Sequence, residues 1–291
     1  MRDGGQAMDF EKQVHPEETT IAVRGLKREY TFLHVTDLHS SRFYDSETPA
    51  MPKNLVDYIT ARRRDWGYEM LTEDRMPAFF AYADSIHADA VLMTGDMLDF
   101  PSDGNMELLY NCVKQAKTPS IFTPGNHDWS FADDYHTAYA ESVQMPKLKD
   151  LCGGDTAFHT VEYPDLIICA LDNCRDYVTE DTVSRFIDLQ KKGKPILLMM
   201  HIPLRVETLD ADTVNYWRRN LTMGPGGLRA WDSNVRILYR EAAERPDTHV
   251  ALVAAGHIHF HHIDTLPNGV PQVVTAVANT GACRVIHLIP A

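Results

Sequence analysis

The sequence predicts an α/β protein, a four-layer αββα sandwich with two mixed β-sheets. Strand-like and amphipathic helix-like segments alternate in the first half of the chain, and strand-like runs pair off near its end. The chain has 291 residues, of which 44% are hydrophobic, which is enough to bury a large core. These observations favour two sheets packed together with helices outside.

The expected elements follow from periodicity and turn residues. Strands are expected over 20–23, 30–35, 90–93, 120–123, 157–163, 166–171, 196–200, 250–253, 272–277 and 284–289. Helices are expected over 73–87, 106–115, 133–143, 180–191 and 233–243. A hairpin turn at 24–27 is expected to join the first two strands, an antiparallel pair is expected at 157–171, and Pro267-Asn268-Gly269 marks another hairpin.

We expect a flexible leader over 1–18 and a single domain over 19–291. Two regions interrupt the alternation. Residues 41–75 contain two prolines and an Arg62-Arg63-Arg64 run, and are interpreted as an insertion that lies over the first loop beside the active site. Residues 205–230, with a Gly224-Pro225-Gly226-Gly227 stretch, are interpreted as an irregular active-site region.

Charge and cysteine content limit the function classes. The 28 Lys and Arg against 41 Asp and Glu give a net charge of −13, which disfavours binding to a nucleic-acid polymer. The longest apolar runs are too short to span a bilayer, and residues 1–20 lack the apolar core of a signal peptide. Five cysteines without a Cys-x-x-Cys pair indicate reduced thiols. We therefore expect a soluble cytoplasmic protein of unknown oligomeric state.

Five short motifs carry Asp, Asn and His, each where a strand gives way to a loop. They are Asp37-Leu38-His39, Gly95-Asp96-Met97-Leu98-Asp99, Gly125-Asn126-His127-Asp128, His201 and Gly256-His257-Ile258-His259. In extended backbone, side chains two apart point the same way, so Asp37 and His39 could share one ion, as could His257 and His259. Asp96 could bridge two cations, and Asn126 offers a neutral oxygen. The motifs therefore predict two adjacent metal ions.

The mixed oxygen and nitrogen donors suit Mn, Fe, Zn or Co better than Mg or Ca, which prefer oxygen alone. The sequence does not choose among these transition metals. A metal pair is especially suited to in-line attack of water on phosphorus, because it can stabilise both the attacking and the leaving oxygen.

The ordered motifs, from about Tyr30 to the C-terminus, resemble those of the calcineurin-like metallophosphoesterases. The resemblance implies a first metal held by Asp37, His39, Asp96 and His259. It implies a second metal held by Asp96, Asn126, His201 and His257. It also implies that His127 faces the leaving-group oxygen as a general acid and that Asp99 hydrogen-bonds His127, keeping it protonated. A helix N-cap is the alternative role for Asp99, and Asp128 is interpreted as a loop-stabilising acceptor.

The chain departs from the family pattern at Phe100. Many members, notably the protein Ser/Thr phosphatases, have Arg there, so a phosphate clamp is missing and a protein phosphatase is disfavoured. Four arginines could replace it: Arg175, Arg205, Arg218 and Arg219. Trp129, Tyr177 and Arg205 are the candidate substrate-binding residues, with Trp129 expected to line the pocket because it follows the third motif.

Other notable residues have simpler interpretations. His261 and His262 extend the last motif and could hold a third metal, but an exposed strand beside the site is favoured. Trp66 and Trp217 could stack on a nucleobase or sugar, but core packing is favoured. The Arg62-Arg63-Arg64 run is interpreted as a solvated helix face rather than a contact for an anionic substrate.

The main hypothesis is a dinuclear metal-dependent hydrolase that cleaves a P–O bond of a small phosphate ester. A phosphodiester or pyrophosphate substrate is favoured over a monoester, because the regions 41–75 and 205–230 could enclose a substrate with two substituents. The alternatives are a phosphomonoesterase, a protein phosphatase, and a non-catalytic scaffold that retains the fold.

Overall fold

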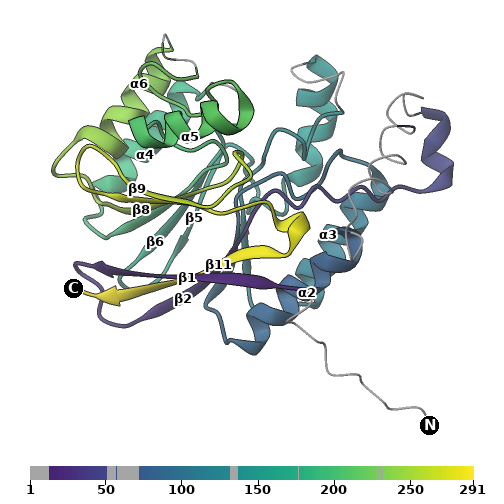
Figure 1. The fold of residues 1–291 in the computed structure, drawn as a ribbon, viewed down its shortest axis with the longest axis horizontal. Coiled ribbons are helices and arrows are strands. Elements are labelled where there is room, and N and C mark those ends of the chain that lie inside the picture. The colour runs from purple at the N-terminus through teal and green to yellow at the C-terminus, as the bar shows by residue number, and fades with distance from the viewer. Residues whose placement is uncertain are drawn as a thin grey trace.

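The computed structural model describes residues 13–50, 57, 72–131, 137–175, 177–228, 230 and 232–291. Two mixed β-sheets pack face to face, and helices cover the outer face of each, as Figure 1 shows. The chain therefore forms the four-layer αββα sandwich predicted from the sequence.

The first sheet has five strands in the order β1-β11-β2-β3-β4. They are β1 (His15–Val23), β2 (Tyr30–Val35), β3 (Ala90–Met93), β4 (Ser120–Phe122) and β11 (Ala282–Pro290). Strands β2, β3 and β4 run parallel, so their carboxyl ends share one edge of the sheet. Strand β11 pairs parallel with β1 and antiparallel with β2.

The second sheet has six strands in the order β5-β6-β7-β8-β10-β9. They are β5 (Phe158–Glu162), β6 (Ile167–Leu171), β7 (Ile196–Met199), β8 (Val250–Ala255), β9 (His262–Thr265) and β10 (Pro271–Val274). The central strands run parallel, while β5 and β9 pair antiparallel at the two edges. The predicted antiparallel pair at 157–171 is therefore confirmed.

The helices lie on the outer faces. They are α2 (Thr72–Ser85), α3 (Asp103–Gln115), α4 (Glu180–Gln190), α5 (Glu207–Trp217) and α6 (Ser233–Tyr239), with π-helical turns at Ala140–Gln144 and Arg240–Glu244. The described residues also include 3-10 turns at Asp45–Ala50, Met145–Leu148 and Ala278–Thr280. Helices α2 and α3 share a hydrophobic cluster with the first sheet, and α4 and α6 share one with the second.

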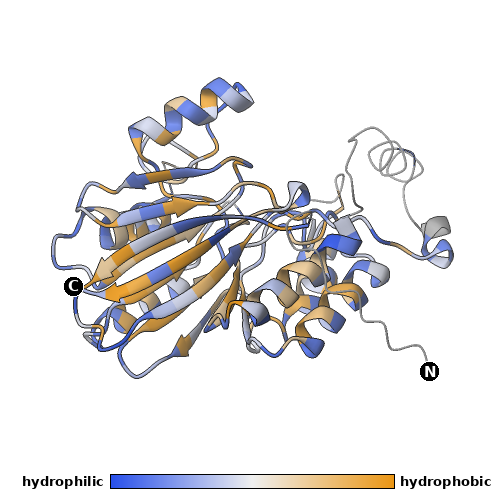
Figure 2. Ribbon diagram, turned by 60° about the horizontal axis from the view of Figure 1, so that its bottom comes forward, coloured by the Kyte–Doolittle hydropathy of each residue, from blue (hydrophilic) through white to orange (hydrophobic). Residues whose placement is uncertain are grey.

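The core has three layers because the strands are buried on both faces. In β7, Leu197 and Met199 face the first sheet, whereas Ile196 and Leu198 pack under the helices. In Figure 2, hydrophobic residues are concentrated in the strands, whereas the helices carry both hydrophobic and hydrophilic residues. Such continuous apolar strands are typical of parallel sheets covered on both sides. The packing fixes the register of the strands, and hence the positions of the loops at their carboxyl ends.

Two expectations for the N-terminal region are corrected. The hairpin predicted at 24–27 is wrong, because β11 lies between β1 and β2. Strand β1 begins at His15, so the leader boundary at residue 18 is too late. The polar residues of β1 hid the start of this strand from a sequence-based prediction. The edge strand is largely exposed, and it is ordered by pairing with β11 rather than by burial.

Three further expectations differ from the structure. The region 205–230 is not irregular throughout, since it contains helix α5. The helix expected over 133–143 falls partly outside the described residues, and a π-helical turn at Ala140–Gln144 continues beyond its predicted end. Most of the insertion at 41–75, with Trp66 and the Arg62-Arg63-Arg64 run, also lies outside them, and its last residues, 72–75, begin helix α2.

No helix in the described part of the chain is long and apolar enough to cross a membrane. The five cysteines are buried and form no disulfide, as the sequence predicted. The cytoplasmic location remains a prediction.

Candidate metal centre

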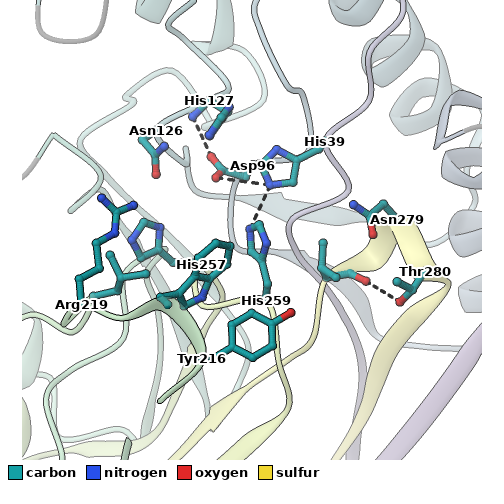
Figure 3. Close-up of a pocket in the computed structure, with 13 residues that line it drawn as sticks. His39, Asp96, Asn126, His127, Tyr216, Arg219, His257, His259, Asn279 and Thr280 are labelled. Carbon is teal, nitrogen blue, oxygen red and sulfur yellow. Dashed lines mark hydrogen bonds and ion pairs between the residues drawn. The ribbon is translucent and has the colours of Figure 1, made fainter. Parts of the chain in front are cut away.

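The predicted ligands converge at the edge where parallel strands of both sheets end, as Figure 3 shows for those that line the cavity. In the first sheet, β2 is followed by Asp37 and His39, β3 by Asp96, and β4 by Asn126. In the second sheet, β7 is followed by His201, and β8 by His257 and His259. The loops after β2 and β3 hold each other, since the amides of Asp37 and His39 donate to the carbonyls of Gly95 and Asp96 at 3.0 and 2.9 Å. The centre therefore lies across the seam between the two sheets.

The backbone at these ligands is not extended, so the argument from strand alternation was wrong. Five of them adopt a left-handed conformation: Asp37 (φ 55°), His39 (φ 49°), Asp96 (φ 51°), His257 (φ 71°) and His259 (φ 67°). Only two other described non-glycine residues have positive φ. This conformation costs about 1–3 kcal/mol per residue and persists where surrounding structure enforces it. The sharp turn after each strand, rather than strand pleating, aims these side chains inward.

Asp37, His39 and His259 form the first cluster of potential ligands. His259 Nε2 lies 3.2 Å from Asp37 Oδ1, and His39 Nε2 lies 3.9 Å from the same oxygen. The two Nε2 atoms are 3.2 Å apart. Two imidazole nitrogens and a carboxylate oxygen this close together suit a shared cation.

Asp96, His201 and His257 form the second cluster. His201 Nε2 lies 3.3 Å from Asp96 Oδ2 and 3.1 Å from His257 Nδ1. Burial lowers the pKa of His201, but the Asp96 and Asp37 carboxylates raise it to about 10. The side chains thus favour a positive charge at this position.

Asp96 connects the two clusters through one oxygen. Its Oδ2 lies 3.3 Å from His201 Nε2 in the second cluster and 3.9 Å from His39 Nε2 in the first. Its other oxygen, Oδ1, accepts the backbone N–H of His127 at 2.8 Å. Oδ2 is therefore the atom of Asp96 that lies near a histidine of each cluster.

Two buried oxygens in the centre lack a hydrogen-bond partner within the described residues: Asp37 Oδ1 and Asn126 Oδ1. A buried acceptor left unsatisfied is costly, so such an atom calls for a ligand or ion. Asp37 Oδ2, in contrast, accepts from Thr36 Oγ1 at 2.7 Å and from the His257 amide at 2.8 Å. The donor set and these two acceptors fit a pair of transition-metal ions.

Neighbouring acceptors fix the tautomers of two ligands. His201 Nδ1 donates to the carbonyl of Thr94 at 2.7 Å, and His39 Nδ1 donates to Asp99 Oδ1 at 3.1 Å. Their Nε2 atoms therefore face the centre with a free lone pair whenever the rings are neutral. This arrangement, a ligating imidazole oriented through its second nitrogen, is usual around protein-bound metals.

His127 lies at the rim of the centre and belongs to neither ligand cluster around Asp37 or Asp96. Its Nδ1 lies 3.3 Å from Asp99 Oδ1 and 3.2 Å from the carbonyl of Asp99. Burial lowers the pKa of His127, but the Asp96 and Asp99 carboxylates raise it to about 9. The imidazole is thus held as a proton donor. Asp99 is not a helix N-cap; Ser102 caps α3.

Asp128 organises the loops, as predicted. Its carboxylate accepts three backbone N–H groups, from Asp96, Leu98 and Gly125, at 2.7–2.8 Å. Gly125 and Gly256 permit the close approach of these loops. A Cβ at Gly125 would lie 2.2 Å from Asp96 Oδ1, and one at Gly256 would lie 1.9 Å from Thr36 Oγ1.

A cavity of about 560 Å³ opens onto the centre. Beyond the predicted centre its lining includes Tyr216, Trp217, Arg219, Leu221, Val277, Asn279 and Thr280. Sequence reasoning missed Tyr216 and Asn279, since neither is part of a motif. The two adjacent aromatic residues at 216–217 were the available signal in the sequence.

The predicted substrate-binding residues do not line this cavity. Trp129 is fully buried in the core and donates to Cys174 Sγ at 3.2 Å. Arg205 Nε is paired with Asp210 at 2.5 Å, and Tyr177 is half-buried elsewhere. Trp217, for which core packing was favoured, does line the cavity. Of the four arginines considered as a phosphate clamp, Arg219 alone is among its lining residues.

Phe100 and the two extra histidines have structural explanations. Phe100 is fully buried and stacks on Phe131, with ring centroids 5.7 Å apart. His262 begins the edge strand β9 and pairs with Asp212 and Asp264 at 3.1 and 3.2 Å. Neither His261 nor His262 belongs to a cluster of three potential metal ligands among the described residues.

Two mixed sheets with paired His and Asp clusters at their strand ends define an α/β sandwich of the two-metal class. A family model described as calcineurin-like phosphoesterase matches residues 30–261, and the chain belongs to this family. The resemblance inferred from the motifs is thereby confirmed.

Two individual proteins illustrate the relationship. A dimetal phosphatase from Danio rerio superposes with a TM-score of 0.55 at 12% identity, covering 89% of this chain and 93% of that one. A protein of Moraxella catarrhalis (strain BBH18), described as a probable cyclic nucleotide phosphodiesterase, is 30% identical over 76 residues. That alignment spans 26% of this chain and 27% of the Moraxella protein.

Proposed function

We propose that the protein hydrolyses a P–O bond of a small phosphate ester with a pair of transition-metal ions, Mn, Fe or Zn. The observation that carries this proposal is the position of Asp96 Oδ2 between the two histidine clusters. Family membership supports the same reaction class. The protein is, on this proposal, a metal-dependent phosphoric ester hydrolase.

The first ion would be held by Asp37, His39, Asp96 and His259, and the second by Asp96, Asn126, His201 and His257. Two bound cations supply Lewis-acid stabilisation of negative charge and lower the pKa of water towards about 7. Histidine and carboxylate donors together suit transition metals.

His127 acts on the leaving group. Its side chain is partly accessible from the cavity, with 38% exposure, and its Nδ1 is held by Asp99. The opposite ring nitrogen, Nε2, is then the atom that donates a proton to the departing oxygen. Such general-acid catalysis contributes about 10²–10⁴-fold to rate. Asp99 keeps the imidazole aimed and charged.

A phosphodiester or pyrophosphate is the proposed substrate. The region 205–230 forms one wall of the cavity through Tyr216, Trp217 and Arg219, which leaves room for a second substituent on phosphorus. The description of the Moraxella relative as a probable phosphodiesterase is consistent with this preference. Phe100 is buried and cannot serve as a phosphate clamp, which disfavours a protein phosphatase.

The test is hydrolysis by the purified chain, supplied with Mn²⁺, of bis-p-nitrophenyl phosphate, p-nitrophenyl phosphate and a phosphopeptide. We expect turnover of the diester at a kcat/KM above that of the other two. Faster turnover of the monoester would overturn the diester preference. Absence of turnover with every ester, despite two bound ions per chain, would favour the scaffold alternative.

A further inference from the structure

The cavity beside the metal centre has two walls that the reaction itself does not explain. One carries Tyr216 and Trp217 from the end of α5, and the other carries Asn279 from the turn Ala278–Thr280 between β10 and β11. Figure 3 shows Tyr216 and Asn279 entering the cavity from these two elements. None of these residues belongs to the ligand clusters.

Asn279 lines the cavity, and the residue as a whole is only 3% exposed. Its Oδ1 is a buried acceptor without a partner. Figure 3 shows Nδ2 on the side of the cavity. Buried polar groups are normally satisfied, so the fold leaves the polar capacity of this amide unused. Nδ2, on the cavity side, is the atom of the amide that a ligand in the cavity can reach.

The backbone around Asn279 is held firmly in place. The amide of Ala278 donates to the carbonyl of Thr36 at 2.9 Å, which ties the turn to the loop after β2. Gly281 ends the turn at φ 92°, and a Cβ there would lie 2.4 Å from Arg75 Nη1. A rigid turn therefore presents the amide, as specific recognition requires.

The opposite wall is an aromatic series that begins at the metal centre. The Trp217 ring meets the His259 ring edge-on, with centroids 5.1 Å apart, and its Nε1 donates to the carbonyl of Ile258 at 2.8 Å. The Tyr216 ring lies 5.2 Å from Trp217 and 5.4 Å from Phe260. Tyr216 is 61% exposed, so its ring is available for stacking by a flat group.

We propose that Tyr216 and Asn279 form the recognition site for the organic group of the substrate, which is a flat heteroaromatic ring such as a nucleobase. Tyr216 stacks on the ring, and Asn279 Nδ2 donates a hydrogen bond to a ring nitrogen or carbonyl oxygen. The substrate class is therefore a nucleoside phosphodiester. This inference rests on the proposed hydrolase function, because it assigns specificity within the same cavity.

Two chromogenic diesters separate recognition from chemistry. Thymidine 5′-(p-nitrophenyl phosphate) and bis-p-nitrophenyl phosphate carry the same leaving group and the same single negative charge, but only the first carries a nucleobase. We expect Asn279→Ala to lower the ratio of kcat/KM, thymidine ester over bis-p-nitrophenyl ester, by about 10-fold, the value of one lost hydrogen bond to an unpaired group. Tyr216→Ala should lower the same ratio by about 10-fold or more through lost stacking.

Two controls keep the result interpretable. Asn279→Asp preserves the shape of the side chain but removes the donor, and it should lower the ratio as Asn279→Ala does. Tyr139→Ala removes another exposed tyrosine, 57% exposed and outside the cavity lining, and should leave the ratio unchanged. Metal content and melting temperature, measured for each variant, identify any that is misfolded.

The outcomes are distinct. If the wild type with Mn²⁺ hydrolyses neither diester, the proposed function fails. If it hydrolyses both but the ratio is the same in wild type, Asn279→Ala and Asn279→Asp, the hydrolase stands and the nucleobase site is overturned. A fall in the ratio for both Asn279 variants and for Tyr216→Ala supports the inference.

Discussion

Asp99 Oδ1 accepts a hydrogen bond from His39 Nδ1 at 3.1 Å. The same oxygen lies 3.3 Å from Nδ1 of His127. One carboxylate thus orients a metal ligand and the proposed proton donor together, whereas the sequence suggested only the second contact. The two imidazole rings meet edge-on with centroids 4.7 Å apart. A change at Asp99 should therefore affect metal binding as well as proton transfer.

Asp99→Asn tests this double role. The amide can still fill the space, but it no longer holds two imidazoles by charge. We expect kcat/KM for bis-p-nitrophenyl phosphate to fall about 10–100-fold and the affinity for the first metal ion to weaken by a similar factor. Metal titration followed by calorimetry measures the second effect. An unchanged metal affinity would show that Asp99 acts on His127 alone.

His127→Ala should remove proton donation while leaving the ligands in place. The loss of kcat should be about 10²–10⁴-fold for an ester with a poor, alkoxide leaving group. It should be smaller for a p-nitrophenyl ester, because that leaving group departs without a proton. Steady-state kinetics on both esters, at equal metal content, provide the measurement. Equal losses on the two would argue against a general-acid role.

Metal binding should stabilise the fold, because Asp37 Oδ1 and Asn126 Oδ1 are buried acceptors without a hydrogen-bond partner among the described residues. A ligand at 100 times its Kd adds about 2.7 kcal/mol to the free energy of unfolding. Thermal unfolding with and without Mn²⁺ should show the increase, and chelation should reverse it. Asp96→Asn, which weakens the bridging oxygen, should lose most of the response. A response of wild-type size in that variant would contradict the bridging role.

Gly256→Ala should disrupt the centre without changing any ligand. The added Cβ would meet Thr36 Oγ1 at 1.9 Å and Asp37 Oδ2 at 2.4 Å. The loop must then move, and the His257 amide loses its hydrogen bond to Asp37. We expect loss of metal binding and a lower melting temperature. Gly154→Ala is the control for an added Cβ without a clash, since nothing lies within 4 Å of a Cβ there. Gly154 has φ 98°, which Gly256 does not share, so any loss of stability in the control reports backbone strain alone, and metal binding should be unchanged.

Asp165 links the two sheets and should make stability depend on pH. It accepts from Tyr30 Oη in β2 and from the Lys27 amide. Burial raises the pKa of Asp165, but these hydrogen bonds outweigh burial and the pKa is lowered. Its stabilisation is therefore present above the unfolded-state pKa of about 3.9 and is lost as pH falls through the lower folded value.

Asp165→Asn should lower the free energy of unfolding by about 1.5–3 kcal/mol at pH 7, the usual value for hydrogen bonds to a charged group. The difference from wild type should shrink below about pH 4. Urea unfolding between pH 3 and 7 measures both effects, with the exposed Asp150→Asn as the control. A difference that stays constant with pH would assign the loss to packing instead.

The sequence predicted the sandwich because its parallel strands are buried on both faces and therefore appear as short apolar runs. Strand β3 was placed at its observed bounds, 90–93. The pairing of strands that are far apart in the chain was harder to predict. Strand β1 is polar and exposed over its first residues, and only its contact with β11 orders it, so a local pattern could not reveal either its start or its neighbour.

The ligand positions were predictable because chemistry restricts which residues can hold a metal pair. The residues that form the cavity walls were not predictable from the sequence. Tyr216 and Asn279 reach the cavity only because α5 and the Ala278–Thr280 turn pack beside the centre, and that packing is tertiary. Trp129 was expected to line the cavity because it follows a motif, but its side chain points into the core.

The position of β11 between β1 and β2 in the first sheet has a consequence for biosynthesis. Strands β1 and β2 leave the ribosome well before the strand that lies between them, which spans residues 282–290. Polypeptides elongate at about 5–20 residues per second, so a partly made sheet that lacks β11 persists for about 10–50 seconds. Such unpaired edges attract other chains. Nascent molecules of this protein should therefore depend on chaperone binding until β11 has left the ribosome.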